Sequence, residues 1–435
     1  MKDKKQELLT QIQGLVREYF EADVREDFVP GSTTVSLIDP PYSWQEVNEA
    51  IDSLLSVQIT LNQTVGNKIQ RFENAWSDYI GTRHGIMVNS GSSANLLALF
   101  ALSNPQLENP IRHGDEVITN AVTWNTTVSP ILAVGAVPVL VDVRLSDCTI
   151  DVDAIEAAIT PKTKAIMPVH LIGNPCSMDA ILDIAKRHGL YVIEDVCEAH
   201  GAKFGDRRCG SMGDIGTFSF FFSHHITTME GGMLMTNNDE IDEIVRVMRS
   251  QGVIRNVKKR EELEAYYKGH PDFADIDERY LFANIGFNLR PTELNGGFGI
   301  EQLKKFPDFL DCRSKNGRYW LDHLSKFDRY FSFPVGNLDE CSWFCFPLIV
   351  KDDAPFSRDQ IRAYLDECKI ESRPIMSGDV SAQPAMALYP HVKGDLTNAK
   401  VVHRNGFFWG NHQGIDQARR EYVVQCIEEF IAKWG

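Results

Sequence analysis

Between about residues 85 and 236, short apolar runs alternate with segments of helical periodicity, and this alternation limits the possible folds more than any other feature. Alternating strands and helices produce a mainly parallel sheet that is covered by helices on both faces. Segments 218–223 and 231–236 add two further apolar runs at the end of the pattern. The sequence therefore predicts an α/β fold with a mostly parallel, mixed sheet of seven strands. The other predicted strands are 85–89, 116–121, 137–143, 164–171 and 191–196, and the helical segments include 94–102, 126–136 and 178–189.

The pattern divides the chain into three predicted parts. Residues 1–40 form a helical extension, because apolar residues such as Leu8, Ile12 and Leu15 recur there at helical spacing. Residues 41–305 form the large domain. Residues 306–435 form a smaller α+β domain, since its apolar runs and amphipathic segments no longer alternate regularly.

Composition excludes several classes of partner. The net charge is −16 and no long block of one sign occurs, which disfavours nucleic acid, because phosphate binding needs clustered Lys and Arg. No apolar run is long enough to span a bilayer, and the N-terminus lacks the pattern of a signal peptide. The nine cysteines are scattered and form no CxxC, so we expect reduced thiols in a cytoplasmic protein and no metal site.

Three short motifs place polar or aromatic residues where predicted strands end. Gly91 and Ser92 stand between a strand and a helix, where free N–H groups suit a phosphate, although such a stretch alone is more often only a helix cap. Asp195 closes another strand and suits a protonated ring nitrogen or a helix cap. Trp124 follows a third strand and is suited to stacking on a flat ring or to the core. Parallel sheets build their sites at this edge, so the three motifs together predict a cofactor site.

With the surrounding segments, these motifs resemble the DegT/AryC1-type sugar aminotransferases, which are pyridoxal-phosphate enzymes of the aspartate-aminotransferase fold (fold type I). The resemblance covers most of the chain. Its motifs, in order, are FENAWSDYIGTRHGIMVNSGSSANLLA, HGDEVIT, TKAIMPVHLIGNP, VIEDVCEAHGA, GDIGTFSFFFS, MEGG and FNLRPTELNGGFGIEQLKK.

The resemblance implies a role for each matching residue. Gly91, Ser92 and Ser219 would hold the cofactor phosphate, together with Asn288 donated by the partner subunit of a homodimer with shared active sites. Trp124 would stack on the cofactor ring, Asp195 would bind its pyridine nitrogen, and Glu198 would lie near its 3-hydroxyl. Ser223 would lie beside the catalytic base.

One position departs from the family pattern. The aminotransferases carry a cofactor-binding lysine four residues after FSF and six before EGG, and both spacings lead to His224. Within the family this replacement resembles the deoxysugar 3-dehydratases. It implies that pyridoxamine 5′-phosphate, or pyridoxal 5′-phosphate, is bound without a covalent bond, with His224 as general base. The implied substrate is a nucleotide-linked 4-keto-6-deoxy sugar that loses its 3-hydroxyl. GDP is the favoured nucleotide, and glutamate restores the amine.

Other interpretations stay open at this point. A dehydratase of the CDP-sugar type is one, but residues 210–311 contain no cysteine for the iron–sulfur cluster that such enzymes carry. A sugar-nucleotide aminotransferase is another, although residues 210–257 contain no lysine. A catalytically silent binding protein with the same fold is a third.

Overall fold

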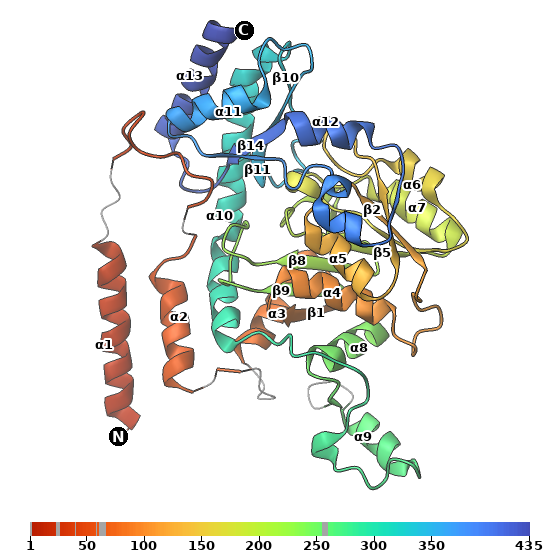
Figure 1. Cartoon of the computed structure of the whole chain (residues 1–435). Coiled ribbons are helices and arrows are strands. Elements are labelled where there is room, and N and C mark those ends of the chain that lie inside the picture. The colour runs from red at the N-terminus through yellow and green to blue at the C-terminus, as the bar shows by residue number, and fades with distance from the viewer. Residues whose placement is uncertain (1, 23–26, 40, 58, 61–66, 255–259) are drawn as a thin grey trace.

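The computed structural model describes residues 2–22, 27–39, 41–57, 59–60, 67–254 and 260–435. Its centre is a sheet in the order β1-β9-β8-β5-β4-β2-β3-β13 (Figure 1). Seven strands of five residues form it, as the sequence predicts: β1 (His84–Val88), β2 (Glu116–Asn120), β3 (Val137–Val141), β4 (Thr163–Met167), β5 (Tyr191–Asp195), β8 (Ile215–Ser219) and β9 (Gly232–Thr236). All neighbours among them pair in parallel except β9, which is antiparallel to β1 and β8.

Two details of the sheet differ from the sequence prediction. Strand β8 ends at Ser219, so 220–223 of the predicted strand 218–223 belong to a turn instead. The backbone turns away there because the N–H of Phe220 donates to the carbonyl of Gly231 and that of Thr228 to the carbonyl of Phe220. An eighth strand of two residues, β13 (Val392–Lys393), pairs in parallel with β3 at the sheet edge. It comes from the C-terminal part of the chain and so attaches that part to the large sheet.

Both faces of the large sheet are buried, which explains why its strands are almost continuously apolar. On one face Ile86, Ile193 and Leu234 pack against helices α4 and α8. On the other face Val192 packs against α7, and Phe218 packs against α3. The helices around the sheet are α3 (Lys68–Ile80), α4 (Gly91–Leu102), α5 (Asn125–Ala133), α6 (Val152–Ala158), α7 (Met178–His188) and α8 (Asp239–Arg249). A small hairpin, β6 (Lys203–Phe204) and β7 (Arg207–Arg208), follows β5.

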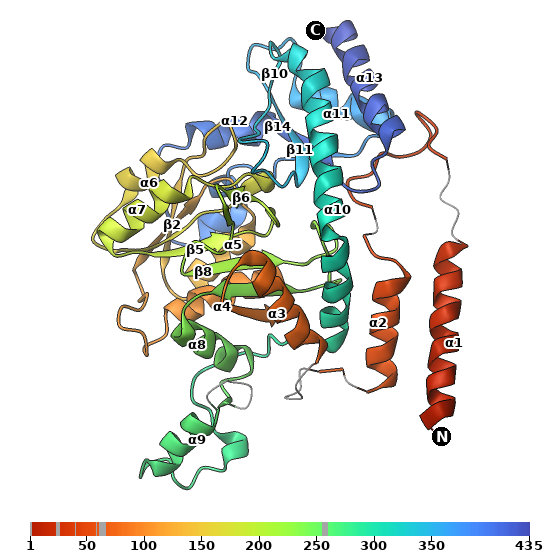
Figure 2. The same cartoon turned by 180° about the vertical axis from the view of Figure 1, so that it is seen from behind.

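A second sheet, in the order β10-β11-β14-β12, forms the core of the C-terminal part. The long helix α10 (Glu293–Leu324) connects the two parts and runs unbroken through residue 305, where the sequence predicts a domain boundary (Figure 2). The elements of this part are β10 (Phe331–Ser332), β11 (Cys345–Val350), β12 (Ser372–Pro374), β14 (Gly406–Gly410), α11 (Arg358–Glu367), α12 (Thr397–Asn405) and α13 (Gln417–Trp434).

The N-terminal helix α1 (Lys2–Glu21) lies outside this body, beside α2 (Trp44–Leu55) in both views (Figures 1 and 2). The amphipathic pattern is only partly used, because Leu9, Val16 and Phe20 are partly buried whereas Leu8, Ile12 and Leu15 are exposed. A short helix, α9 (Arg260–Gly269), belongs to a charged excursion that projects from the body after α8. No helix in the described part of the chain is long and apolar enough to cross a membrane.

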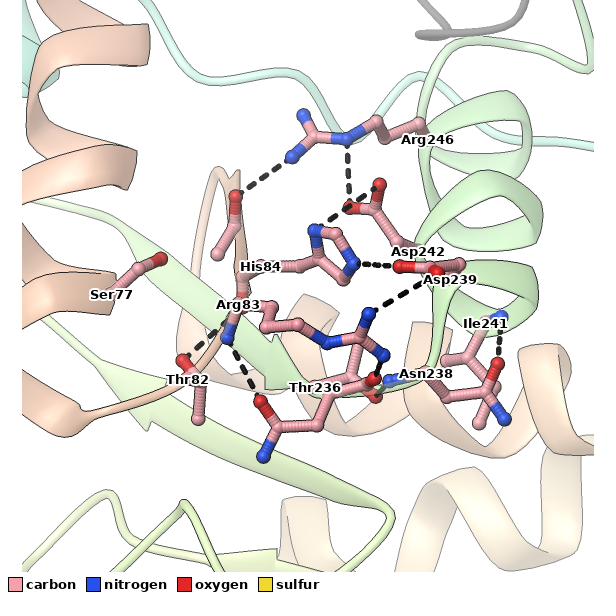
Figure 3. A network of polar contacts seen from close by, with 12 residues as sticks. Ser77, Thr82, Arg83, His84, Thr236, Asn238, Asp239, Ile241, Asp242 and Arg246 are labelled. Atoms are coloured by element: carbon pink, nitrogen blue, oxygen red, sulfur yellow. Dashed lines mark hydrogen bonds and ion pairs between the residues drawn. The ribbon is translucent and has the colours of Figure 1, made fainter.

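A polar network fixes the edge where β1 and α8 meet (Figure 3). His84, the first residue of β1, is bound to Asp239 through Nε2 (2.6 Å). Asp242 Oδ1 accepts from Arg246 Nε (2.8 Å), and Arg246 Nη1 reaches the buried carboxylate of Glu73 on α3 (3.1 Å). The network connects α3, β1 and α8 through hydrogen bonds and ion pairs.

Candidate active site

A cavity of about 780 Å³ opens at the carboxyl ends of the parallel strands, between the large sheet and the C-terminal part. This is the place where parallel α/β sheets build their ligand sites. Eight of the nine sequence-predicted site residues line it: Gly91, Ser92, Trp124, Asp195, Glu198, Ser219, Ser223 and His224. The structure therefore brings together residues that lie up to 133 positions apart in the sequence, from Gly91 to His224.

The first turn of α4 forms one end of the cavity. Ser90 caps the helix, since its Oγ accepts from the N–H of Ser93 (3.1 Å). A Cβ atom at position 91 would lie 2.3 Å from the Cβ of Ser219, so only glycine permits this close approach of α4 to β8. The free N–H groups of the turn and the Ser219 hydroxyl consequently line the same end, an arrangement suited to a phosphate.

Asp195, at the end of β5, is held by neutral donors. Asn95 Nδ2 and Thr127 Oγ1 both donate to its Oδ2, at 2.8 and 2.9 Å, and the N–H of Cys197 donates to Oδ1 (3.2 Å). The carboxylate is buried and has no cationic partner among the described residues. A fixed negative charge of this kind can pair with a protonated ring nitrogen.

Glu198 lies further along the same loop and is also buried. The N–H of Ile172 donates to its Oε2 (3.0 Å). Burial, with a smaller contribution from the neighbouring Asp195 charge, raises the pKa of Glu198 to about 8. At neutral pH Glu198 is therefore mostly protonated and can donate a hydrogen bond to an oxygen of a ligand.

His224 lies in the turn after β8, where its N–H donates to the carbonyl of Phe221 (3.1 Å). Its half-buried ring faces the cavity and lies 5.7 Å from the ring of Phe344, between centroids. His225 is fully buried and turned away, with Nε2 bound to the carbonyl of Ser342 (3.0 Å). Of these two histidines, only His224 is among the described residues that line the cavity.

Burial, followed by the nearby Arg313 guanidinium, lowers the pKa of His224 to about 3. Arg313 is itself buried. Its Nη1 donates to the carbonyl of Phe344 (2.9 Å), and no carboxylate of the described residues pairs with it. An ordinary imidazole titrates near neutral pH, whereas His224 stays in the neutral form well below that range.

This lowered pKa predicts a titration result for the protein without ligands. The carbon-2 proton of His224 should keep its neutral chemical shift in an NMR titration from pH 8 to pH 5. An ordinary imidazole would change over this range with a midpoint near about 6.5. Because folded His224 resists protonation and the unfolded chain does not, its contribution to stability should fall as the pH drops below about 6.5. The variant Arg313→Gln should raise the His224 midpoint, and a wild-type midpoint near 6.5 would contradict the assignment.

Comparison with known proteins places this site in a family. A sequence model of the DegT/DnrJ/EryC1/StrS aminotransferase family matches residues 44–428. The chain belongs to this family.

Among the relatives of this DegT/DnrJ/EryC1/StrS protein are several dehydratases. It is 37% identical to GDP-4-keto-6-deoxy-D-mannose 3-dehydratase of Yersinia pseudotuberculosis over 80% of this chain and 88% of that enzyme. It is 35% identical to dTDP-4-dehydro-2,6-dideoxy-D-glucose 3-dehydratase of Saccharopolyspora spinosa over 96% of this chain and 91% of that enzyme. The solved structure of the E. coli GDP-4-keto-6-deoxy-D-mannose-3-dehydratase with bound hydrated PLP superposes with a TM-score of 0.81. That comparison shows 34% identity over 90% of this chain and 98% of that chain.

Asn288 is the one predicted site residue that this DegT/DnrJ/EryC1/StrS chain does not place in its own cavity. It follows the α9 excursion and forms a backbone bridge with Ser250, and its side-chain oxygen accepts from Arg290 Nε (3.0 Å). The prediction assigns it to the cavity of a partner subunit, so its position outside the chain's own cavity is compatible with that role.

Several cavity residues are not singled out as site residues by the sequence argument. Asn95 and Thr127 orient Asp195. Asn95 lies within the first quoted motif and Thr127 lies three residues after Trp124, and in the sequence both resemble ordinary polar residues at helix starts. Arg313 has no local signal, since it lies within the amphipathic α10. Arg255, Arg373 and His412 are candidate sugar or nucleotide contacts in the sequence, although each is more readily explained as a surface or packing residue. Arg373 and His412 both line the cavity, whereas Arg255 lies outside the described residues.

Proposed function

We propose that this protein is a nucleotide-sugar 3-dehydratase that uses pyridoxamine 5′-phosphate, or its pyridoxal form, without a covalent bond to the chain. A single observation carries the proposal. The cavity is lined by eight of the nine predicted site residues, yet His224 occupies the position of the family lysine and no lysine is among the cavity-lining residues that the structure describes. The dehydratase relatives support the same reaction, and they favour a GDP-linked 4-keto-6-deoxy sugar as substrate.

The residues present fit this cofactor. The close contact of Gly91 with Ser219 leaves the first turn of α4 exposed to a phosphate, with Ser92 beside it. Asp195 would bind the protonated ring nitrogen, and the protonated Glu198 would donate to the ring hydroxyl. Trp124, whose side chain is 60% exposed at the cavity, has a free face for stacking on the ring. Ser223 would lie beside the base.

When bound, the cofactor supplies an amine that condenses with the sugar ketone and a ring that accepts electrons. His224 is neutral and would take a proton at a ring nitrogen beside the cofactor amine, although burial and the Arg313 charge make it a weaker base than a free imidazole. The Arg313 charge disfavours the resulting imidazolium, so His224 readily passes the proton on. The acceptor is the hydroxyl that leaves carbon 3 as water. Asp195 stabilises the positive charge of the ring nitrogen throughout.

Restoring the amine requires a second reaction, for which glutamate is the proposed donor. A related structure of GDP-4-keto-6-deoxymannose-3-dehydratase contains a trapped PLP-glutamate geminal diamine, which supports this choice. The proposed assembly is a homodimer in which each subunit completes the site of the other. A sugar-nucleotide aminotransferase is the second candidate, since GDP-perosamine synthase of Caulobacter vibrioides is 34% identical over 88% of this chain and 95% of that enzyme. That reaction would have to proceed without a lysine in the cavity.

The proposed assembly predicts an effect of Asn288→Ala. Loss of this amide should weaken retention of the cofactor, because one phosphate contact across the dimer disappears. A hydrogen bond to a charged group contributes about 1.5–3 kcal/mol, so the dissociation constant should rise by roughly ten- to a hundredfold. Equilibrium dialysis of the protein with pyridoxal phosphate measures this constant. Asn284→Ala, on the same exposed segment, is the matched control, and unchanged retention by Asn288→Ala would count against the shared site.

The proposed function is tested with purified protein, pyridoxamine phosphate and separate GDP-, CDP- and dTDP-linked 4-keto-6-deoxy sugars. Mass spectrometry should detect loss of oxygen at carbon 3, and an ammonia assay should detect an equal amount of ammonia. An amino sugar product without loss of oxygen would instead establish the aminotransferase.

A further inference from the structure

One wall of the cavity comes from the segment between α1 and α2, residues 35–39 and 41–42, here called the N-terminal wall. Leu37, Ile38, Asp39 and Pro41 of this segment line the cavity together with His224. The family match begins at residue 44, so this wall lies outside the region that the family model describes. None of the cofactor roles proposed above involves it.

The N-terminal wall is fixed to the C-terminal part by main-chain hydrogen bonds. The N–H of Val35 donates to the carbonyl of Lys369 (2.8 Å), and the N–H of Glu371 donates to the carbonyl of Val35 (3.0 Å). The N–H of Leu37 donates to Glu371 Oε2 (2.9 Å), and the carbonyl of Ser36 accepts from His412 Nε2 (2.9 Å). A segment held at successive residues presents a fixed surface to the cavity.

This surface lies close to the catalytic turn. The ring of Tyr42 contacts that of Phe222, two residues before His224, with centroids 6.5 Å apart. At the other end, a Cβ atom at Gly410 would lie 2.5 Å from the carbonyl oxygen of Leu37, so the wall packs directly on the strand end beside Asn411 and His412. The wall therefore lies between the turn that carries His224 and the end of β14.

The chemistry of the wall favours an uncharged, partly apolar group. The wall lines the cavity with the apolar residues Leu37, Ile38 and Pro41, and Ile38 is 37% exposed. A 6-deoxy sugar carries a methyl group in place of a hydroxymethyl group, and such a methyl suits an exposed isoleucine.

We propose that the N-terminal wall is a specificity-determining surface for the sugar, and that Ile38 packs against the apolar, methyl-bearing side of the 4-keto-6-deoxy ring. The proposal rests on the function proposed above. It assigns this selectivity to a segment that precedes the family match, so relatives with a different N-terminal segment can share the cofactor site while accepting different sugars.

The test compares Ile38→Ala with Ile38→Val and with Leu8→Ala, an exposed residue of α1 remote from the wall. The steady-state substrate is GDP-4-keto-6-deoxymannose, and the binding probes for cofactor-free protein are this sugar nucleotide and GDP alone. Ile38→Ala should lower kcat/KM at least about tenfold, mainly through KM, because one methylene missing from an apolar contact is worth about 10–200-fold. Its dissociation constant for the sugar nucleotide should rise by a similar factor while that for GDP stays within about twofold. Leu8→Ala should resemble the wild type, and Ile38→Val should lie between the wild type and Ile38→Ala.

Two outcomes would overturn the inference. Unchanged kcat/KM and binding in Ile38→Ala would show that the wall does not contact the sugar. An equal loss of affinity for GDP would show that it contacts the nucleotide. Failure of the proposed function is distinct from both, because the wild-type protein would then leave the sugar nucleotide unconverted in the same assay.

Discussion

Replacing His224 with lysine should convert the site from non-covalent to covalent cofactor binding and abolish dehydration. The new amine would occupy the position of the family lysine and face the same cavity. Burial and the Arg313 charge, which lower the pKa of His224, would also keep a lysine amine neutral and therefore nucleophilic. Formation of the 3-deoxy product should fall about a thousandfold, within the 10²–10⁴ range that general acid–base catalysis contributes.

Borohydride reduction followed by peptide mass spectrometry directly detects a covalent bond between the cofactor and a lysine. Reduced wild-type protein should release its cofactor on dialysis, whereas His224→Lys should retain it on the peptide that contains residue 224. His225→Gln is the matched control, because that neighbouring side chain is turned away from the cavity. Product formation by His224→Lys at the wild-type rate would show that His224 is not the base. A reduced cofactor on any wild-type lysine would overturn the dehydratase proposal itself.

Much of this site is predictable from the sequence because its residues follow strand ends. The order of β–α units places Gly91, Trp124 and Asp195 at one edge of a parallel sheet, and counting from the FSF and EGG motifs finds His224. These signals are local, so they can be recognised in the sequence without knowledge of the tertiary structure.

The remaining features depend on contacts between distant segments. Asn95 and Thr127 orient Asp195 across 100 and 68 residues, and neither has a sequence signal that distinguishes it from a helix start. Strand β13 joins β3 only because the C-terminal part folds back onto the sheet edge. The N-terminal wall is likewise hidden in the sequence, since its place in the cavity depends on pairing with residues 369–371 and 412. The apolar run also extends the predicted strand too far beyond the end of β8. Phe220 is buried and apolar like a strand residue, but it lies after the last residue of β8.

The segment that carries Asn288 is also supported from a distance, by a buried charge cluster on α3 and α8. Glu73 is 1% exposed, and its two oxygens accept from Arg249 Nη1 (2.7 Å) and Arg246 Nη1 (3.1 Å). Oε1 also accepts from the N–H of Met87 (2.8 Å) on β1. The carbonyl of Arg249 accepts in turn from the N–H of Leu289, next to Asn288. The cluster therefore connects the sheet edge in Figure 3 to the predicted contact with the partner subunit.

Glu73→Gln should consequently destabilise the protein by about 3–5 kcal/mol, because it leaves two buried guanidinium groups without their shared carboxylate. Burial raises the pKa of Glu73, but Arg246 and Arg249 outweigh it and hold that pKa below its ordinary value. The contribution of the pair is therefore complete above about pH 4.5 and decreases as the pH falls below that value. Urea unfolding at pH 7 measures the loss as a lower transition midpoint.

Glu428→Gln, which removes a surface pair with Lys326, should change stability by no more than about 1 kcal/mol and serves as the control. A shift as small as this control in Glu73→Gln would mean that the arginines find other acceptors. A large shift that is accompanied by weaker cofactor retention would establish that the cluster also positions the segment carrying Asn288.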